Sequence, residues 1–309
     1  MIVTLGGGVG GSKFLHSLVL GGGEEIAAIV NTGDDIEIAG LHISPDIDIN
    51  IYTLAGVIHP QGWGFKDESY ACQTVLSEVY GEIGWFHLGD KDLATHIFRT
   101  ALMKQGRPLS EITAILCKKW NIPADILPMS DDRVQTLIDT PDGSFDIQQY
   151  LILRKMSDKV LGVRYAGAER SAPAPGVLAA IERADRIILC PSNPFVSIGP
   201  ILAVPGIREA VKASRAKVIA VSPLIGGKAV KGPLDRMMRD LGFETSPLGI
   251  ASFYGDLLDG MVIDREDEPY RESLEARGLA VLATNTRMDD SGRKAALGSE
   301  VIGFIAGWF

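Results

Sequence analysis

Short apolar runs alternate with stretches of helical period along most of this chain, which predicts strands and helices in turn. The beginning of the chain shows the pattern clearly. An apolar run at 1–5 leads into glycines at 6–11, followed by a helical pattern at 12–20 and a second apolar run at 25–31. Runs this short and apolar are typical of strands buried on both faces of a parallel sheet. The segment therefore predicts a strand–helix–strand unit.

The middle of the chain has a different character. Residues 68–122 carry helical patterns separated by glycine and proline, and we predict a helical insertion there rather than a second domain. Strand-like runs follow at 126–129, 134–139 and 145–153. Beyond residue 175 the alternation returns, with predicted strands at 186–190, 217–222, 261–264 and 280–283 and predicted helices at 176–184, 206–214, 234–241 and 300–309.

These elements predict one α/β domain over residues 1–309. We expect a Rossmann-like, doubly wound and mainly parallel sheet between two layers of helices. The composition agrees, because 46% hydrophobic and 22% charged residues are ordinary values for a globular protein.

Net charge and cysteine content indicate which partners and which cellular compartment this protein has. A net charge of −9 disfavours a nucleic-acid partner, which would need a basic face. No apolar run approaches the roughly 18 residues of a membrane span, and the beginning of the chain lacks the basic segment of a signal peptide. Three cysteines, far apart in the sequence, suit a reducing compartment. We therefore expect a cytoplasmic protein without a membrane partner.

A glycine-rich segment between the first predicted strand and helix is the clearest candidate for chemistry. Its spacing fits G-x-G-x-x-G, in which glycine permits a tight turn and a close approach of phosphate to the backbone. The following helix N-terminus attracts anions, and Lys13 adds a positive charge. Phosphate binding is favoured, with a purely structural turn as the alternative. The glycines predicted to bind phosphate are Gly6, Gly8, Gly10 and Gly11.

Acidic residues follow the second predicted strand. Asp34 and Asp35 come directly after it, and Asp46 and Asp48 follow a short distance later. Acids at the carboxyl ends of parallel strands can hold magnesium through oxygen ligands, often with phosphate as a further ligand. Two other interpretations stay open: aspartates that stabilise turns, and a ribose contact of a nicotinamide or flavin dinucleotide.

Two further polar segments have defined positions. In LGDKDLATH (88–96), Asp92 is a candidate helix N-cap, and His96 lies four residues later on the same face. In CPSNP, Ser192 and Asn193 follow a predicted strand, where α/β sheets bind ligands. G-x-S-x-G, HExxH and P-loop patterns are absent from the sequence, which removes the usual support for hydrolase, metallopeptidase and P-loop readings.

The motifs GGGVGG, NTGDD, ISPDID, LGDKDLATH, ILPMSDD and PSNPFVSIGPIL occur in that order. Together they resemble the 2-phospho-L-lactate transferase family of coenzyme F-420 biosynthesis, over residues 1–264. The resemblance implies a magnesium-dependent transferase. Its donor is a guanosine diphosphate that carries a three-carbon acid: phospholactyl, or the enolpyruvyl or glyceryl equivalent. Its acceptor is the ribityl hydroxyl of the deazaflavin Fo, and GMP is released.

The resemblance also implies roles for single residues and a homodimer. The residues implied in catalysis and magnesium binding are Asp34 and Asp48. Those implied in binding the donor are the glycine loop, Lys13, Ser192 and Asn193. Those implied in binding Fo are Asp48, His87, Asp90, Asp92 and His96, with His87 standing where archaeal members carry lysine. A nicotinamide-dependent oxidoreductase or a non-catalytic nucleotide-binding protein would explain the glycine loop, but not the other motifs.

Overall fold

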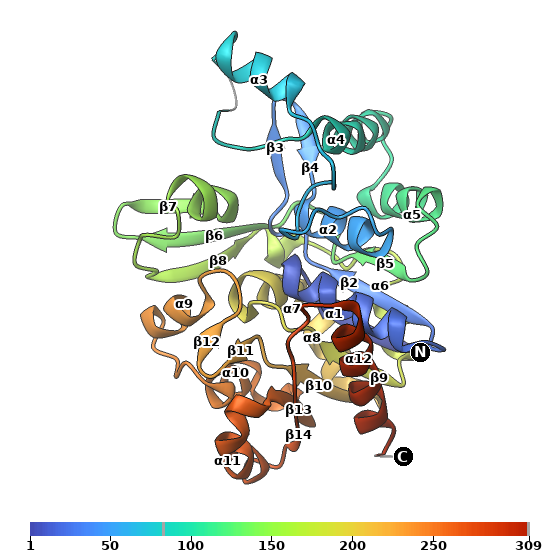
Figure 1. Ribbon diagram of the computed structural model, residues 1–309, viewed down its shortest axis with the longest axis vertical. Coiled ribbons are helices and arrows are strands. Elements are labelled where there is room, and N and C mark those ends of the chain that lie inside the picture. Colours follow the sequence, from blue (N-terminus) through green and yellow to red (C-terminus); the bar gives the residue numbers. More distant parts are fainter. Residues whose placement is uncertain (82–83, 308–309) are drawn as a thin grey trace.

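A seven-stranded parallel sheet forms the middle layer of the computed structural model, which describes residues 1–81 and 84–307 (Figure 1). The strand order is β14-β13-β10-β9-β1-β2-β5, and all neighbours pair in parallel. The strands are β1 (Ile2–Gly6), β2 (Ile26–Val30), β5 (Asp125–Pro128), β9 (Arg186–Leu189), β10 (Lys217–Val221), β13 (Gly260–Asp264) and β14 (Ala280–Thr284).

This order contains a switch of direction between β1 and β9. The chain builds the sheet outward from β1 through β2 to β5, and then returns to add β9 on the other side of β1. The loops that follow β1 and β9 therefore leave the same edge of the sheet side by side. Ligands of doubly wound sheets bind at such a position. The predicted Rossmann-like fold in three layers is confirmed.

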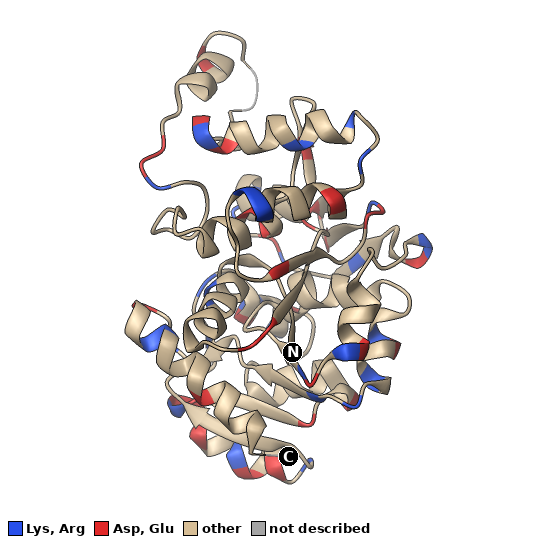
Figure 2. Ribbon diagram, turned by 90° about the vertical axis from the view of Figure 1, so that its right-hand side faces the viewer, with Lys and Arg blue, Asp and Glu red and all other residues tan. Residues whose placement is uncertain are grey.

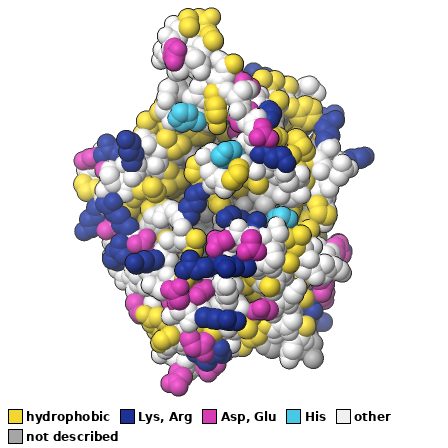
Figure 3. Space-filling view, viewed as in Figure 1, with side chains coloured by type: hydrophobic (Ala, Val, Ile, Leu, Met, Phe, Trp, Pro, Cys, Tyr) yellow, Lys and Arg dark blue, Asp and Glu magenta, His cyan; other side chains and the backbone are white. Residues whose placement is uncertain are grey.

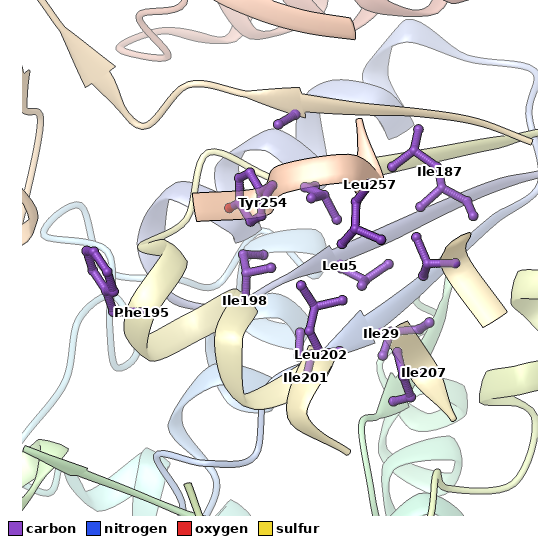
Figure 4. Packing of buried hydrophobic residues seen from close by; sticks show 14 of the residues in the cluster. Leu5, Ile29, Ile187, Phe195, Ile198, Ile201, Leu202, Ile207, Tyr254 and Leu257 are labelled. Carbon is purple, nitrogen blue, oxygen red and sulfur yellow. The ribbon is translucent and has the colours of Figure 1, made fainter. Parts of the chain in front are cut away.

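Helices cover both faces of the sheet, and alternate strand residues face two separate cores. Ile2 packs against one face and Val3 against the other, as the two-residue period of a strand requires. Figure 4 shows part of the larger core, where Leu5 and Ile29 from the strands meet Ile198. The helices that pack on the Ile2 face include α1 (Gly8–Gly21), α2 (Pro45–Leu54), α5 (Leu109–Lys119) and α12 (Ser291–Ala306). Those on the Val3 face include α6 (Val177–Arg183), α7 (Gly199–Ala203), α8 (Ile207–Ala213), α9 (Leu234–Asp240) and α10 (Pro247–Tyr254).

The described part of the stretch predicted as a helical insertion contains three helices. Besides α5, these are α3 (Ala71–Glu78) and α4 (Asp90–Met103), and α3 projects farthest from the sheet (Figure 1). A hairpin of β3 (Ile36–Ile38) and β4 (Leu41–Ile43) rises beside them and was not predicted. Its strands are too short to show an alternating pattern. Its turn is made by Ala39 and Gly40, both with positive φ, as tight hairpins require.

A second, antiparallel sheet lies beside the main one. It consists of β6 (Gln135–Thr140), β7 (Gly143–Asp146) and β8 (Gly162–Ala166). The strand predicted at 145–153 is wrong beyond Asp146, because a π-helix, η1 (Gln149–Leu153), follows. The Asp146 carboxylate accepts the Gln149 N–H at 2.9 Å, and the Gln149 side chain accepts the Asp146 N–H at 3.3 Å. This reciprocal cap ends the strand and starts the helix.

The predicted C-terminal helix begins earlier than expected. Asp290 caps its first turn by accepting the Arg293 N–H at 2.9 Å, so α12 starts at Ser291 rather than at residue 300. The last two predicted residues, 308–309, lie outside the described residues. The remaining elements are β11 (Leu224–Ile225), β12 (Lys228–Ala229), α11 (Arg271–Glu275), η2 (Ala168–Arg170), η3 (Pro194–Ile198), η4 (Gly255–Leu257) and η5 (Arg265–Tyr270).

Charge lies mainly on the outer helices and loops, while the central strands carry little (Figure 2). Among the described residues, no single helix is long and apolar enough to cross a membrane. Two segments, Pro194–Ala203 and Ile207–Ala213, meet that test only as a pair, with a bend of 88° between them.

Candidate active site

The loops after β1 and β9 are held together by one serine. The Ser192 hydroxyl donates to the Gly7 carbonyl at 2.8 Å, and its oxygen lies 3.3 Å from the Gly7 N–H. A Cβ at Gly10 would clash with the Pro191 carbonyl, so glycine is needed there for the two loops to approach. Gly8 differs, because it has φ +66° and open space where a Cβ would be. The family resemblance implied that Ser192 binds the donor substrate. The structure shows that Ser192 also positions the glycine loop.

A buried asparagine at the end of β2 joins the acidic segments. The Asn31 Nδ2 atom lies 2.9 Å from Asp34 Oδ1, 2.9 Å from Asp46 Oδ2 and 3.2 Å from the Val196 carbonyl. An amide nitrogen carries two hydrogens, so three acceptors, two of them carboxylates, share two donors. We refer to Asn31, Asp34 and Asp46 as the Asn31 cluster.

The Asn31 cluster is short of positive charge. Burial, and then the neighbouring Asp46, raise the pKa of Asp34 well above its usual value. Burial also raises the pKa of Asp46 to about 6, although hydrogen bonds from Asn31 and Gly8 oppose the shift. No lysine or arginine is among the groups that act most on either pKa. The carboxylate oxygens of Asp34 and Asp46 are suitable ligands for a hard divalent cation, which would remove the repulsion between the two carboxylates.

The sequence pattern offered Asp46 as one of four acids that could hold magnesium, but the family resemblance implied Asp48 rather than Asp46 in that role. The Asp46 Oδ1 atom accepts the Gly8 N–H at 2.7 Å, so a carboxylate takes one amide that the glycine pattern assigned to phosphate. The sequence held one indication, since Asp46 stands two residues before Asp48 in ISPDID. Only the fold shows which of the two aspartates faces the glycine loop.

A second group of buried polar residues lies between α2 and α4. Arg99 is fully buried, donates to the Asp48 carboxylate and lies 3.3 Å from His96 Nδ1. His96 Nε2 lies 3.4 Å from Asp92 Oδ1, which also accepts the Tyr52 hydroxyl at 2.8 Å. We refer to Asp48, Asp92, His96 and Arg99 as the Arg99 cluster. It unites three of the residues that the family resemblance implied in Fo binding.

The Arg99 cluster carries its own positive charge. Burial disfavours the charged guanidinium, but the Asp48 carboxylate outweighs it and raises the pKa of Arg99. Burial likewise opposes ionisation of Asp92, yet its contacts with His96 and Tyr52 leave its pKa below the usual value. Asp48, Asp92 and His96 also have the mutual spacing of metal ligands, but the guanidinium already supplies a cation there. Arg99 was missed from the sequence, where nothing distinguishes it from a solvated helix arginine.

The predicted magnesium pair is divided between these two clusters. Asp34 shares the Asn31 amide with Asp46, whereas Asp48 bonds to Arg99. The family resemblance had implied Asp34 and Asp48 as the magnesium ligands, whereas the sequence pattern alone left all four acids of these segments as candidates. The structure instead favours Asp34 with Asp46 as the carboxylates for a cation.

The other residues implied in Fo binding lie outside the Arg99 cluster. The Asp90 carboxylate accepts backbone N–H groups at the start of α3, each at 3.0 Å, and thereby joins α3 to α4. His87 is exposed, and its ring centroid lies 6.4 Å from that of Tyr70. The predicted N-cap role of Asp92 is wrong, because α4 begins at Asp90 after the N-cap Gly89.

Asn193 and Lys13 complete the set of predicted residues. Asn193 Oδ1 accepts the Phe195 N–H at 2.9 Å and caps the π-helix η3. The Phe195 carbonyl accepts the Tyr165 hydroxyl at 2.7 Å, which satisfies a group that the wider π-turn leaves free. Lys13 lies half-buried near the start of α1.

Comparisons with known proteins agree with this architecture. Two crystal structures of a UPF0052 family protein from Bacillus halodurans match with TM-scores of 0.64 and 0.66. Each covers 97% of this chain and 98% of that protein, at 16% and 19% identity, which supports the fold alone.

Relatives found by sequence share a larger fraction of identical residues with this chain than these two structures do. A phosphoenolpyruvate transferase from Kitasatospora aureofaciens is 44% identical, covering 94% of this chain and 92% of that protein. One from Streptomyces griseus is 42% identical over 97% of both, and one from Mycolicibacterium smegmatis is 38% identical over 92% and 94%. The family described as 2-phospho-L-lactate transferase CofD matches residues 2–303. The chain therefore belongs to the CofD family of transferases in coenzyme F-420 biosynthesis.

Proposed function

We propose that this chain transfers a phosphoenolpyruvyl group from a guanosine diphosphate donor to the ribityl hydroxyl of Fo. The hydroxyl oxygen forms a bond to the distal phosphorus, the bond from that phosphorus to GMP breaks, and the hydroxyl proton is released. The family supports the reaction type, and the names of several relatives favour the enolpyruvyl acid over the lactyl or glyceryl one.

The observation that carries this proposal is the position and charge of the Asn31 cluster. It lies beside the glycine loop at the switch point of the sheet, through the bond from Gly8 to Asp46. Phosphoryl transfer depends mainly on neutralising charge and aligning the reacting groups. Asp34 and Asp46 would hold magnesium, which supplies positive charge to phosphate oxygens.

The remaining residues of the site bind the substrates and hold the acidic side chains in place. The helix N-terminus at α1 and Lys13 attract the donor phosphates. Asn31 fixes Asp34 relative to Asp46 and also binds the Val196 carbonyl, so the segment after β9 keeps its place beside the acids. The buried Arg99 cluster holds α2 against α4, and we propose that Asp48, Asp92 and His96 shape the acceptor side of the site.

The test uses the whole chain with Fo, magnesium and each of the three donors, followed by mass spectrometry of the product. We expect a phosphodiester of Fo and stoichiometric GMP, with the enolpyruvyl donor preferred. Absence of product with every donor would refute the transfer, and a preference for another acid would refute the donor assignment.

A matched pair of variants tests the site. Asp34→Asn should lower the rate by at least about 100-fold, because charge stabilisation by a metal contributes several kcal/mol. Asp185→Asn is the control, since Asp185 precedes β9 at the opposite edge of the sheet and pairs with the N-terminal amine. Equal rates for the two variants would remove Asp34 from the site.

A further inference from the structure

Three lysines converge near the start of α1, outside the two acidic clusters. Lys13 lies on α1, Lys294 on α12 and Lys231 in the loop before α9. Within the described residues, none of them forms an ion pair. Asp290 is the acid that acts on Lys294, and its carboxylate is engaged as the cap of α12.

Helix packing places Lys13 beside Lys294. α1 and α12 run in the same direction, and they touch where a Cβ on Gly298 would clash with the Ser17 carbonyl. One turn before that contact, the two helices carry Lys13 and Lys294 respectively. The pKa of Lys294 is lowered by burial and then by the charge of Lys13, as this placement requires.

A loop from the other half of the chain brings the third lysine to the same place. Lys231 Nζ lies 3.8 Å from the centroid of the Trp63 ring and donates to the Gln61 carbonyl. Gly62, between them, packs on Val9 in the first turn of α1, where a Cβ would lie 2.6 Å from Val9 Cγ1. Burial, and then Lys13, lower the pKa of Lys231.

These contacts leave positive charges close together without carboxylate partners. Figure 3 shows Lys and Arg side chains gathered around a recess in the middle of the face that carries the start of α1. Like charges in such an arrangement repel one another, and an oxyanion that bridges them would remove that cost. The adjacent helix N-termini favour the same charge.

We propose that Lys13, Lys231 and Lys294 form a phosphate-binding site at the start of α1, with Lys231 leaving the Trp63 ring to reach the ligand. In the proposed function, on which this assignment of the ligand rests, the phosphate belongs to the diphosphate of the donor. The family resemblance implied only Lys13 in binding the donor phosphates. The proposed site adds Lys231 and Lys294, which come from distant parts of the chain.

The test is calorimetric titration of the whole chain with pyrophosphate, without Fo. Lys231→Gln and Lys294→Gln should each weaken binding about five- to tenfold, which is the loss of one charge-assisted contact. Lys104→Gln is the matched control, because it removes one charge from an exposed position at the end of α4 and should change affinity less than twofold. Binding by the Lys231 and Lys294 variants within twofold of the parent protein would overturn the proposal.

Indole fluorescence adds a second measurement. Saturating pyrophosphate should change the emission of the parent protein, because Lys231 leaves Trp63, and Trp63→Phe should abolish most of that change. An unchanged response in Trp63→Phe would overturn the movement of Lys231. Neither measurement involves turnover, so loss of lysine-dependent binding and loss of transfer to Fo are separate failures.

Discussion

The two polar clusters of the site differ in where their positive charge comes from. The Arg99 cluster contains a guanidinium that bonds to Asp48, although Asp48 Oδ2, His96 Nε2 and Arg99 Nε are buried without a hydrogen-bond partner among the described residues. The Asn31 cluster holds two carboxylates on one neutral amide, and neither carboxylate forms an ion pair within the described residues. A buried carboxylate paired with a cationic side chain needs no outside ion, whereas one without such a partner is a candidate ligand for an outside cation. The contrast makes the Asn31 cluster the stronger candidate for a metal cation, because the Arg99 cluster already contains a cationic side chain.

One helix supplies both clusters. Asp46 and Asp48 stand two residues apart on α2, and positions with that spacing point to different sides of a helix. Asp46 therefore meets the glycine loop, while Asp48 meets α4. A shift of α2 would disturb both clusters together, which links the acceptor side of the site to the phosphate side.

The largest expected effect is on the Arg99 cluster. Arg99→Met should lower the free energy of unfolding by about 3–5 kcal/mol, because it leaves the buried Asp48 without its partner. Urea unfolding measures this. The double variant Arg99→Met with Asp48→Leu should recover most of the loss, since an apolar pair replaces the ionic one. A double variant no more stable than Arg99→Met would show that the guanidinium packs rather than pairs.

The second effect is the response to magnesium. A ligand present at a hundred times its Kd stabilises the folded state by about 2.7 kcal/mol. We expect magnesium to raise the melting temperature of the parent protein by several degrees and that of Asp34→Asn hardly at all. Asp48→Asn should keep the response. Loss of the response in Asp48→Asn but not in Asp46→Asn would restore the pairing of Asp34 with Asp48 that the family resemblance implied.

The third effect is on stability in the absence of metal, and it compares an Asp→Asn substitution in one cluster with the same substitution in the other. Asp48→Asn should destabilise the fold by about 2 kcal/mol, since Arg99 loses its counter-charge. Asp34→Asn should stabilise it by about 1 kcal/mol, because a repelled carboxylate is removed and the Asn31 hydrogen bond can be kept.

The stabilisation of Asp34→Asn should depend on pH. Burial and Asp46 raise the pKa of folded Asp34, so its ionisation costs stability as pH rises above about 4, where the unfolded chain ionises. The advantage of the variant should therefore be greater at pH 8 than at pH 5. Equal shifts at both pH values, or the same sign for Asp34→Asn and Asp48→Asn, would contradict the comparison.

The smallest effect concerns Tyr52. Its hydroxyl donates to Asp92 at 2.8 Å, and Tyr52→Phe should cost about 1 kcal/mol by removing that bond. Transfer activity should fall much less than in Asp34→Asn. A loss of activity as large as that of Asp34→Asn would place the Arg99 cluster in the chemistry itself.

The sequence-based predictions succeeded where a pattern is complete within a short segment, and they failed where particular contacts decide the structure. Strands buried on both faces and helices with regular punctuation were found, because each pattern is complete within a short segment. The β3–β4 hairpin and η1 were missed, since a two-residue turn and a reciprocal side-chain cap decide them. Asp92 was a candidate N-cap because its contact with Tyr52, 40 residues away in the sequence, does not show in a local pattern.

The sequence by itself determined the strands of the main sheet, most of the helices around it, the glycine loop and the motifs of the transferase family, because these are local or are read residue by residue. Only the tertiary structure decided which acids lie together. Asn31 meets Asp34 within its own turn, but it meets the Val196 carbonyl across 165 residues. Asp46 and Asp48 are near neighbours in the sequence, but their side chains meet different partners. Partners of a buried charge are chosen by packing, and packing brings together segments that no single stretch of sequence contains.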